Sequence, residues 1–375
     1  MRAFSQPIRL ALLGCGRFGW RHLEAFQHLG SARAVVVADI DEARARETAR
    51  HFSIPHYTTD FREAACWPDV EAVDICLPTY LHAEAVQVAA EAGRHIFCEK
   101  PLALTPEQAR QAVAACRRAG VKLQVGFCRR FDNGWLAAAQ VIRSGVLGRP
   151  VVWRHATGTP GAPQPWFFDI DKGGGPFVDG AIHWYDFGRF LFGEAESVVA
   201  STSTLQPGRT APDTGVVSVR FASGDQLQLL WSWGLPAGVR VDELHEVLGP
   251  RGALTMVPRH GLEDAVVNGA LSGAEAHGTR PGANGVDPGS LGYLWLMRAD
   301  RMGPEPVAYQ RNNMVEDELA AFVRAVQSDA EPAVGGEEAV AALEIAWAVL
   351  ESARSGRVVH LAGAAVGSRS PGGNA

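Results

Sequence analysis

The sequence contains very little lysine. Of its 35 basic residues only three are lysines, at positions 100, 122 and 172, and the others are arginines. Because arginine serves here wherever a positive charge is enough, each remaining lysine is a candidate for a role that needs a compact ammonium group. The net charge of −6 also argues against a basic surface that binds nucleic acid or anionic membranes.

Long apolar segments are absent as well. No run approaches the ~18 residues that a membrane-spanning helix needs, so we expect no membrane partner. The apolar residues 8–13 follow a basic residue, as in a signal peptide, but they are few and lead into glycines rather than into a cleavage site. A buried first strand is the better interpretation.

The six cysteines form no C-x-x-C pair, and several of them lie in apolar runs, where a small buried thiol is common. We therefore expect a reduced, cytoplasmic protein. Histidine, cysteine and acidic residues show no metal-ligand spacing, and no G-x-S-x-G or Cys–His arrangement indicates nucleophilic catalysis. The sequence thus predicts neither a metal site nor a nucleophilic mechanism.

Up to about residue 130, short apolar runs alternate with segments of helical spacing. The runs lie at 8–14, 32–39, 71–77, 95–99 and 122–127. Two of the helical segments end at Gly93 and Gly120, and glycine is the usual residue at a helix stop. Nearly continuous apolar strands separated by helices predict the α/β Rossmann layout, a doubly wound parallel sheet.

The pattern then changes to strands at short spacing. Strands are expected at 151–158, 196–205, 214–224, 225–234 and 244–256, and helices at 133–145, 180–193, 315–327 and 336–355. The triplet Ser223-Gly224-Asp225 predicts a hairpin turn. Consecutive strands with short turns predict an α+β region with a large, mostly antiparallel open sheet. Such a sheet leaves a face that needs cover, so we expect a homodimer or homotetramer.

A chain of 375 residues is too long for one comfortable core, so about two domains are expected. We predict a dinucleotide-binding Rossmann domain at 1–130 and an α+β domain for substrate binding and oligomerisation at 131–362. Residues 268–292 are rich in Gly, Ala and Pro and predict a long loop or insertion. The tail at 363–375 is expected to be disordered.

The string GCGRFG lies between the first predicted strand and the first helix. Gly14 permits a tight turn, Gly16 lets the backbone approach a pyrophosphate, and Gly19 lets the helix pack closely on the sheet. The helix N-terminus offers free amides to the phosphates. The string alone is a weak signal in a glycine-rich chain, but its position makes it strong. Gly14, Gly16, Arg17, Phe18 and Gly19 are therefore predicted to bind the cofactor.

Asp39 ends the second predicted strand, 20 residues beyond Gly19. A carboxylate there accepts hydrogen bonds from the ribose hydroxyls of NAD and repels a 2′-phosphate. Arg44, on the following helix, is able to compensate for that repulsion, and Asp39 alternatively only caps this helix. We favour NAD over NADP as the cofactor.

A further group of residues surrounds the fourth and fifth strands. The fourth strand ends before Pro78, His82 lies near the start of the next helix, and Glu99-Lys100-Pro101 closes the fifth strand. Lys100 would thus stand at the carboxyl end of a parallel strand, where open α/β sheets bind ligands. Its ammonium can donate a hydrogen bond to a substrate oxygen or, once deprotonated, receive that oxygen's proton. Pro101 fixes the backbone directly after it.

Two more motifs follow, VGFCRRFD at 125–132 and GGGPFVDGAIHWYDFGRFLFG at 173–193. With the Glu-Lys-Pro segment they make the chain similar to the Gfo/Idh/MocA oxidoreductase family, which includes glucose-fructose oxidoreductase and inositol dehydrogenase. The resemblance runs from residue 8 to about 360, although residues 205–310 match only in general pattern. It implies that Pro78, His82, Glu99 and Lys100 contact the cofactor.

The third motif carries Asp179 and His183, four residues apart on a predicted helix and therefore on one face. A histidine suits proton removal from an alcohol near neutral pH, and the carboxylate can orient the substrate or the imidazole. Such a pair is often only a surface contact, but the resemblance implies a catalytic and substrate-binding role for both. Either His183 or Lys100 is the proton acceptor, and the sequence leaves this open.

Other candidates are less specific. Arg129 resembles a substrate contact of the inositol dehydrogenase branch, and Trp166 can form an apolar wall beneath a sugar ring, although either is also consistent with a structural role. His82 contacts the cofactor or only caps its helix. Lys172 would lie near the site if the glycines at 173–175 fold inward, but we favour solvent exposure for this side chain.

The expected function is an NAD(H)-dependent dehydrogenase, or ketone reductase, that acts on a secondary alcohol of a sugar, cyclitol or related polyol. One alternative is a reductase of another substrate class, such as an imine, a dihydrodiol or a keto-sugar intermediate. Another is a dinucleotide-sensing regulator that keeps the fold without catalysis. The intact Lys100, Asp179 and His183 argue against the regulator.

Overall fold

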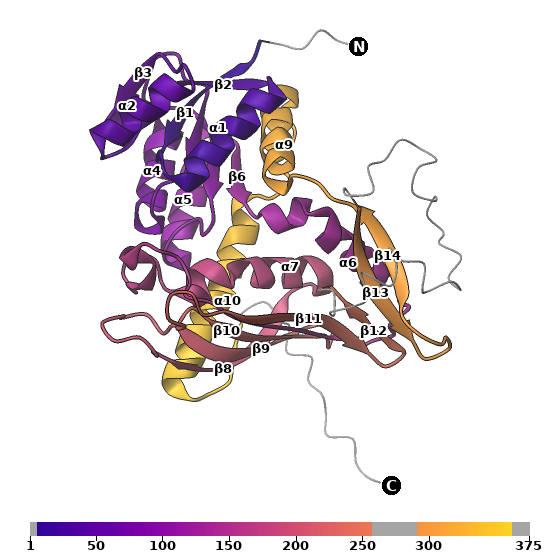
Figure 1. Cartoon of the computed structure of the whole chain (residues 1–375). Helices are drawn as coiled ribbons and strands as arrows, with labels where there is room; N and C mark the ends of the chain where they lie inside the picture. The colour runs from indigo at the N-terminus through magenta and orange to yellow at the C-terminus, as the bar shows by residue number, and fades with distance from the viewer. Residues whose placement is uncertain (1–5, 257–290, 362–375) are drawn as a thin grey trace, which may run out of the picture.

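The computed structural model describes residues 6–256 and 291–361. Two sheets organise the chain, and helices lie on both faces of the first sheet and on one face of the second (Figure 1). The first sheet contains six parallel strands and the second contains nine strands that are mostly antiparallel. The predicted fold class is confirmed.

The first sheet has the strand order β3-β2-β1-β4-β5-β6. Its strands are β1 (Ile8–Leu13), β2 (Ala32–Ala38), β3 (His56–Thr58), β4 (Ala72–Ile75), β5 (His95–Glu99) and β6 (Leu123–Gly126). The connecting helices are α1 (Arg17–Leu29), α2 (Glu42–His51), α3 (Phe61–Ala65), α4 (Thr79–Glu91) and α5 (Pro106–Ala119). The central strands carry apolar residues on both faces because helices cover both sides. The sequence missed β3 and α3, which are too short to show a period.

Glycine ends two of these helices as expected. Gly93 and Gly120 have φ angles of 72° and 67°, a left-handed conformation that closes α4 and α5. Helix α5 begins with a capping box between Thr105 and Gln108, with Pro106 at its first position. These signals fix where each helix starts and stops.

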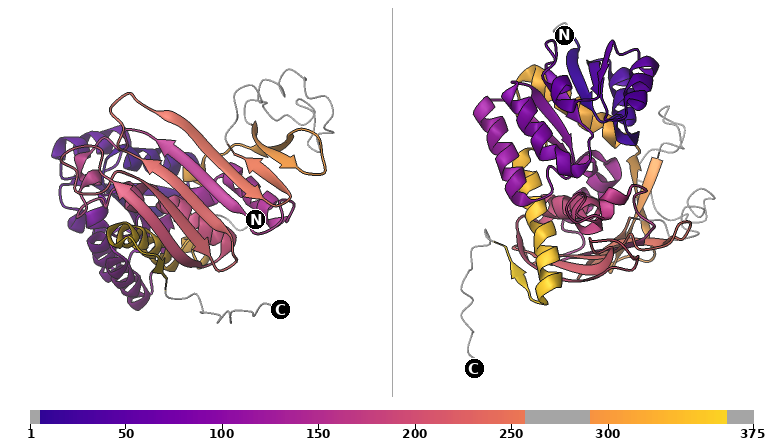
Figure 2. Two further views of the ribbon diagram at one scale, coloured as in Figure 1. Left: turned by 90° about the horizontal axis from the view of Figure 1, so that it is seen from below. Right: turned by 90° about the vertical axis from the view of Figure 1, so that its left-hand side faces the viewer.

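The second sheet has the order β14-β13-β12-β11-β7-β10-β9-β8-β15. Its strands are β7 (Val152–Gly158), β8 (Ala195–Ser203), β9 (Thr214–Phe221), β10 (Gln226–Ser232), β11 (Val241–Gly249), β12 (Gly252–Thr255), β13 (Leu291–Arg298), β14 (Glu305–Gln310) and β15 (Val359–His360). The predicted hairpin turn joins β9 to β10, and Gly224 there has a φ of 88°. Figure 2 shows that none of the helices in the described ranges covers the outer face of this sheet.

One prediction for this region was wrong, and two strands were missed. The expected single strand 244–256 is a hairpin, because the chain turns at Pro250 and Arg251 and pairs Gly249 with Gly252. Strands β13 and β14 were not predicted. Most of the predicted loop at 268–292 lies outside the described residues, as does the predicted disordered tail at 363–375.

Within the described residues, four long helices follow residue 130: α6 (Asn133–Arg143), α7 (Ile182–Phe192), α9 (Met314–Ser328) and α10 (Gly336–Ser355). Helix α9 returns to the first sheet, where Leu319 and Phe322 pack with Phe26 and Phe97. Helix α10 lies against α5, α7 and β8 and thus connects the two layers (Figure 1). The domain boundary near residue 130 stays a prediction. Among the described helices, none combines the length and the apolar character of a membrane span.

Replacing Phe322 by Ala should lower the free energy of unfolding by about 3–5 kcal/mol, because the ring is 1% exposed and packs edge-on against Phe97. Urea unfolding followed by circular dichroism would measure the change. The matched control is Leu205→Ala on a side chain that is 54% exposed, where we expect a change within about 0.5 kcal/mol. Equal effects of the two substitutions would contradict the packing of α9 on the first sheet.

Candidate active site

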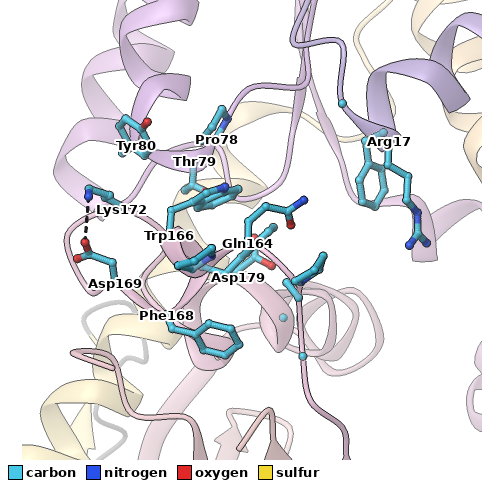
Figure 3. A pocket seen from close by; sticks show the side chains of 18 of the residues that line it. Arg17, Pro78, Thr79, Tyr80, Gln164, Trp166, Phe168, Asp169, Lys172 and Asp179 are labelled. Atoms are coloured by element: carbon cyan, nitrogen blue, oxygen red, sulfur yellow. Dashed lines mark ion pairs between the residues drawn. The ribbon is translucent and has the colours of Figure 1, made fainter. Parts of the chain in front are cut away.

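A cavity of about 1850 Å³ opens at the carboxyl ends of the parallel strands, where the first layer meets α7 and β10 of the second (Figure 3). Twelve of the residues predicted for the site line it: Gly14, Gly16, Arg17, Phe18, Asp39, Pro78, His82, Glu99, Lys100, Trp166, Asp179 and His183. Gly19 and Arg129 do not line it. The cavity therefore brings together side chains from both halves of the chain.

The glycine loop between β1 and α1 has the shape that a pyrophosphate needs. Gly14 has a φ of 99°, and a Cβ there would lie 2.5 Å from the Cys76 carbonyl oxygen. A Cβ on Gly19 would lie 2.1 Å from the Gly14 carbonyl oxygen, so this glycine permits the turn and the helix to touch. A Cβ on Gly16 would meet no protein atom within 4 Å. Gly16 also begins α1 without a side-chain cap, which leaves helix amides for an anion.

Asp39 is held rigidly at the end of β2. Its carboxylate accepts hydrogen bonds from the backbone amides of Cys15 and Asp41, each at 3.0 Å, and an Arg44 Nη1 donor lies 3.2 Å away. The cap of α2 is Asp41, which accepts a bond from the Arg44 amide. The alternative in which Asp39 only caps that helix was therefore wrong.

Lys100 connects the two layers inside the cavity. Its Nζ donates to the Asp179 carbonyl oxygen at 3.0 Å and lies 3.2 Å from Asp179 Oδ2. The Lys100 side chain is 14% exposed and the Asp179 side chain 7%. Burial raises the pKa of the Asp179 carboxyl, and the Lys100 ammonium opposes that shift.

The prediction that Asp179 and His183 lie on one regular helix was wrong. Asp179 lies in a π-helical turn, Pro176–Gly180, and His183 lies in the first turn of α7. Both still line the cavity. Burial, with the positive charges of Lys100 and Arg129, holds the pKa of His183 well below its usual value, so the imidazole is neutral near pH 7. Its Nδ1 is fully buried and has no hydrogen-bond partner within the described part of the chain.

His82 and Glu99 support the wall behind Lys100. The two ring nitrogens of His82 lie 2.7 Å from the carbonyl oxygens of Leu77 and Pro101, so this residue connects the loops after β4 and β5. It lies within the first turn of α4 and is not the N-cap, which is Pro78. Glu99 Oε2 accepts a bond from the Lys100 amide at 3.1 Å.

Sequence reasoning missed the buried His22–Asp74 pair beneath this wall. His22 Nδ1 lies 3.0 Å from Asp74 Oδ2, and its Nε2 lies 3.3 Å from Glu99 Oε1. Burial opposes a charge on His22, but Cys76 and Asp74 outweigh it and raise the pKa of the imidazole well above its usual value. One signal was available, since Asp74 is a carboxylate in an otherwise apolar strand.

The less specific candidates lie in different places. Trp166 stacks on Phe167 at 3.7 Å and faces the cavity, and Lys172 is half exposed and pairs with Asp169 at 3.3 Å (Figure 3). Arg129 lies behind the wall, with its Nη1 3.1 Å from Asp132 and its guanidinium over the Trp135 ring. Further aromatic lining residues were not predicted: Phe167, Phe168, Trp184, Trp231 and Trp233.

Two family models match the chain. The model of an oxidoreductase family with an NAD-binding Rossmann fold, Gfo/Idh/MocA, matches residues 8–127, and the model of the Gfo/Idh/MocA C-terminal domain matches residues 135–255. Together they cover more than half of the sequence.

Named relatives cover almost the whole chain. An inositol 2-dehydrogenase of Rhizobium meliloti is 31% identical over 358 residues, which is 95% of this chain and 99% of the relative. A myo-inositol 2-dehydrogenase of Thermotoga maritima is 31% identical over 359 residues, 94% of this chain and 98% of the relative. Among solved structures, levoglucosan dehydrogenase in complex with NADH and L-sorbose is 25% identical, with a TM-score of 0.77 over 95% of this chain and 99% of that one.

The two glycines of the loop give opposite expectations. Gly14→Ala should destabilise the fold, because the Cβ meets the Cys76 carbonyl oxygen at 2.5 Å and φ is positive. Gly16→Ala should fold normally, because its Cβ meets no protein atom, yet it should weaken dinucleotide binding by about tenfold or more by filling space at the loop. Thermal unfolding and titration with NADH fluorescence would separate these effects. Normal NADH affinity in a folded Gly16→Ala variant would show that the phosphates bind elsewhere.

Proposed function

We propose that the chain, which belongs to the Gfo/Idh/MocA oxidoreductase family, is an NAD(H)-dependent dehydrogenase of a secondary alcohol in a sugar, cyclitol or related polyol. The observation that carries the proposal is the convergence of Lys100, Asp179 and His183 on one cavity beside the glycine loop. The names of the relatives support the substrate class, because they include inositol and levoglucosan dehydrogenases.

The cavity fits the cofactor that the family implies. The loop at Gly14 and Gly16 and the amides at the start of α1 would hold the pyrophosphate, and Asp39 would accept hydrogen bonds from a ribose. When bound, NAD supplies the acceptor for a hydride from the carbinol carbon. Pro78, His82 and Glu99 would shape the wall between this loop and Lys100.

Lys100 positions the alcohol oxygen in this proposal. An ammonium has three N–H donors, and Asp179 takes two of them through its carbonyl and carboxylate oxygens. The third donor is left for the substrate oxygen and would stabilise negative charge that develops there. Asp179 fixes the direction of that donor and offers its other carboxylate oxygen to a neighbouring substrate hydroxyl.

His183 takes the hydroxyl proton in the oxidation direction and returns it in the reduction direction. Because its Nδ1 is buried, Nε2 is the atom that would face the substrate. A neutral imidazole can accept a proton, and the low pKa makes His183 a base that is ready at neutral pH. Trp166 and the other aromatic side chains would contact the apolar face of the ring, while Arg129 acts on His183 through its charge.

We also propose, as a property of the same enzyme, a cytoplasmic homodimer or homotetramer. The outer face of the second sheet exposes Val199, Val216, Leu230 and Val241, each at least 48% exposed. Apolar side chains in such an arrangement favour contact with a second copy.

The catalytic roles can be tested by Lys100→Met and His183→Asn. Each should lower kcat by about 10²-fold or more on a substrate found in a panel of inositols, aldoses and aminocyclitols, and His183→Asn should retain NADH affinity. Asn133→Ala removes a side-chain hydrogen bond to the Gln310 carbonyl oxygen at a residue that does not line the cavity, and it serves as a control with normal turnover. Near-normal turnover in both catalytic variants would refute the assignment. Tight NADH binding without turnover across the panel would instead favour a sensor.

The pH dependence identifies the base. A base is active when deprotonated, so with His183 as base kcat/KM should be level through neutral pH and fall only when the pH drops below the low pKa of that imidazole. Burial lowers this pKa most, followed by the charges of Lys100 and Arg129. Arg129→Gln removes one of these charges, so the acid limb of the kcat/KM profile should move to higher pH. An acid limb that stays in place in Arg129→Gln and disappears in Lys100→Met would make Lys100 the base.

Cofactor choice depends on Asp39 and Arg44. Asp39→Ser removes the carboxylate that repels a 2′-phosphate and that pairs with Arg44, so the ratio of kcat/KM for NADP to that for NAD should rise by about tenfold or more. The double variant with Arg44→Ala should lose most of that gain. Parallel assays with both cofactors would measure the ratio, and an unchanged ratio in Asp39→Ser would show that this carboxylate does not face the ribose.

A further inference from the structure

We propose that His155, Glu243 and His245 form a binding site for a divalent transition-metal ion, with zinc as the best match. The site is separate from the proposed catalytic centre, because none of the three residues lines the cavity. The sequence predicted no metal site because residues 155, 243 and 245 have no recognisable ligand spacing. The pairing of two strands brings them together.

The geometry follows from the second sheet. Strands β7 and β11 run antiparallel, and His155 lies directly opposite His245. Their ring centroids are 5.1 Å apart, and His155 Nδ1 lies 3.5 Å from Glu243 Oε1. One possible ligand atom from each residue lies within 4.8 Å of the others. Ligand atoms around tetrahedral zinc are about 3.3 Å apart, so small side-chain movements would close the site.

Three ring nitrogens of the two imidazoles have no hydrogen-bond partner among the described residues. His155 and His245 are 2% and 4% exposed. Both ring nitrogens of His155 and Nε2 of His245 are buried, and no residue of the described ranges 6–256 and 291–361 forms a hydrogen bond with them. Buried polar atoms without partners are unfavourable, and convergence of several on one carboxylate indicates a missing ligand. The next cross-strand pair, Arg154 and Glu246, is by contrast joined by a hydrogen bond of 3.0 Å.

The protonation states suit a cation. Burial, with a smaller effect of Arg129, lowers the pKa of His155 to about 4, and burial also lowers the pKa of His245 well below its usual value. Both rings are therefore neutral at pH 7, and each has a lone pair for a metal. Glu243 offers a carboxylate, whose pKa is raised by burial with Arg129 opposing that shift, and its half-exposed side chain gives an ion a route from solvent. Two imidazole nitrogens and one carboxylate match the three protein ligands of a zinc ion that keeps its fourth coordination position open.

The positive charge of Arg129 opposes binding of a cation. Burial is the largest influence on the pKa values of the two imidazoles and of Glu243, and Arg129 lowers each of these pKa values. Its guanidinium is partly neutralised by Asp132 at 3.1 Å and lies over the Trp135 ring at 5.2 Å. The remaining repulsion would lower the affinity for a cation without blocking the ligand atoms.

The surrounding aromatic residues hold the ligands in place. Trp184 packs on the His155 ring at 4.6 Å, and Trp153 stacks on the His245 ring at 5.6 Å. Restricted rings reduce the entropy lost on binding. A metal ion here would link β7 to β11 directly behind the helix that carries His183, so we assign it a structural role.

The test uses the full chain, first treated with a chelator and then titrated with Zn²⁺, or with Co²⁺ as a visible probe of coordination. We expect one equivalent to bind, with d–d absorption typical of low-coordinate Co²⁺, and Zn²⁺ to raise the melting temperature. Glu243→Gln and His245→Gln should each weaken binding by at least about tenfold and abolish the Zn²⁺-dependent thermal shift. Glu243→Gln is the decisive variant, because a half-exposed side chain can change without disturbing the core.

The matched control is His360→Gln on the exposed end of β15, which should bind Zn²⁺ like the parent. NADH affinity in every variant reports that the fold is intact. The proposal is overturned if the parent binds neither ion at micromolar concentrations. It is equally overturned if folded Glu243→Gln and His245→Gln bind as the parent does, because the metal would then lie elsewhere.

Discussion

The contact between Lys100 and Asp179 is the interaction on which the proposed chemistry depends. It joins residues 79 positions apart, one at the end of a strand of the first sheet and the other in a turn of the second layer. Neither half of the chain contains a complete site by itself. The arginine that this sequence uses almost everywhere else could not replace Lys100, because a guanidinium is broader and holds its proton too firmly.

The surroundings of this contact are built from backbone more than from side chains. Gly173, Gly174 and Gly175 lead into the π-helical turn, and a Cβ on any of them would lie within 2.7 Å of a neighbouring atom. Gly173 meets Phe167 of the preceding loop, Gly174 meets Val178 of the turn and Gly175 meets Ala211, and such close approaches are possible only with glycine. On the opposite side His82 binds two carbonyl oxygens and keeps the loops after β4 and β5 together. Rigid loops on both sides explain how a flexible lysine side chain is held in one direction.

The sequence predicted what local patterns encode. Apolar periodicity gave the Rossmann sheet, and glycine spacing gave the loop at Gly14. The strands β11 and β12 were merged, although Gly249-Pro250-Arg251-Gly252 between them is a turn signal in the sequence. Asp74 in an apolar strand was a signal for a buried polar partner. That this partner is His22, and that His155 lies opposite His245, could not be predicted, since these residues meet only when strands or layers align. Residues that meet only through long-range strand pairing leave no recognisable spacing pattern in a single sequence.

The position of α9 has a consequence for the order in which the protein is synthesised. This helix lies beyond residue 313, yet Val315, Leu319 and Phe322 complete an apolar cluster with Ile8 and other residues of the first strand and helix. A nascent chain that has emerged only as far as the sixth strand would therefore expose this face of its dinucleotide-binding sheet to solvent. The first sheet thus depends on a helix that follows the whole of the second sheet's β7–β14 in sequence, so its folding is completed only after α9 has been synthesised.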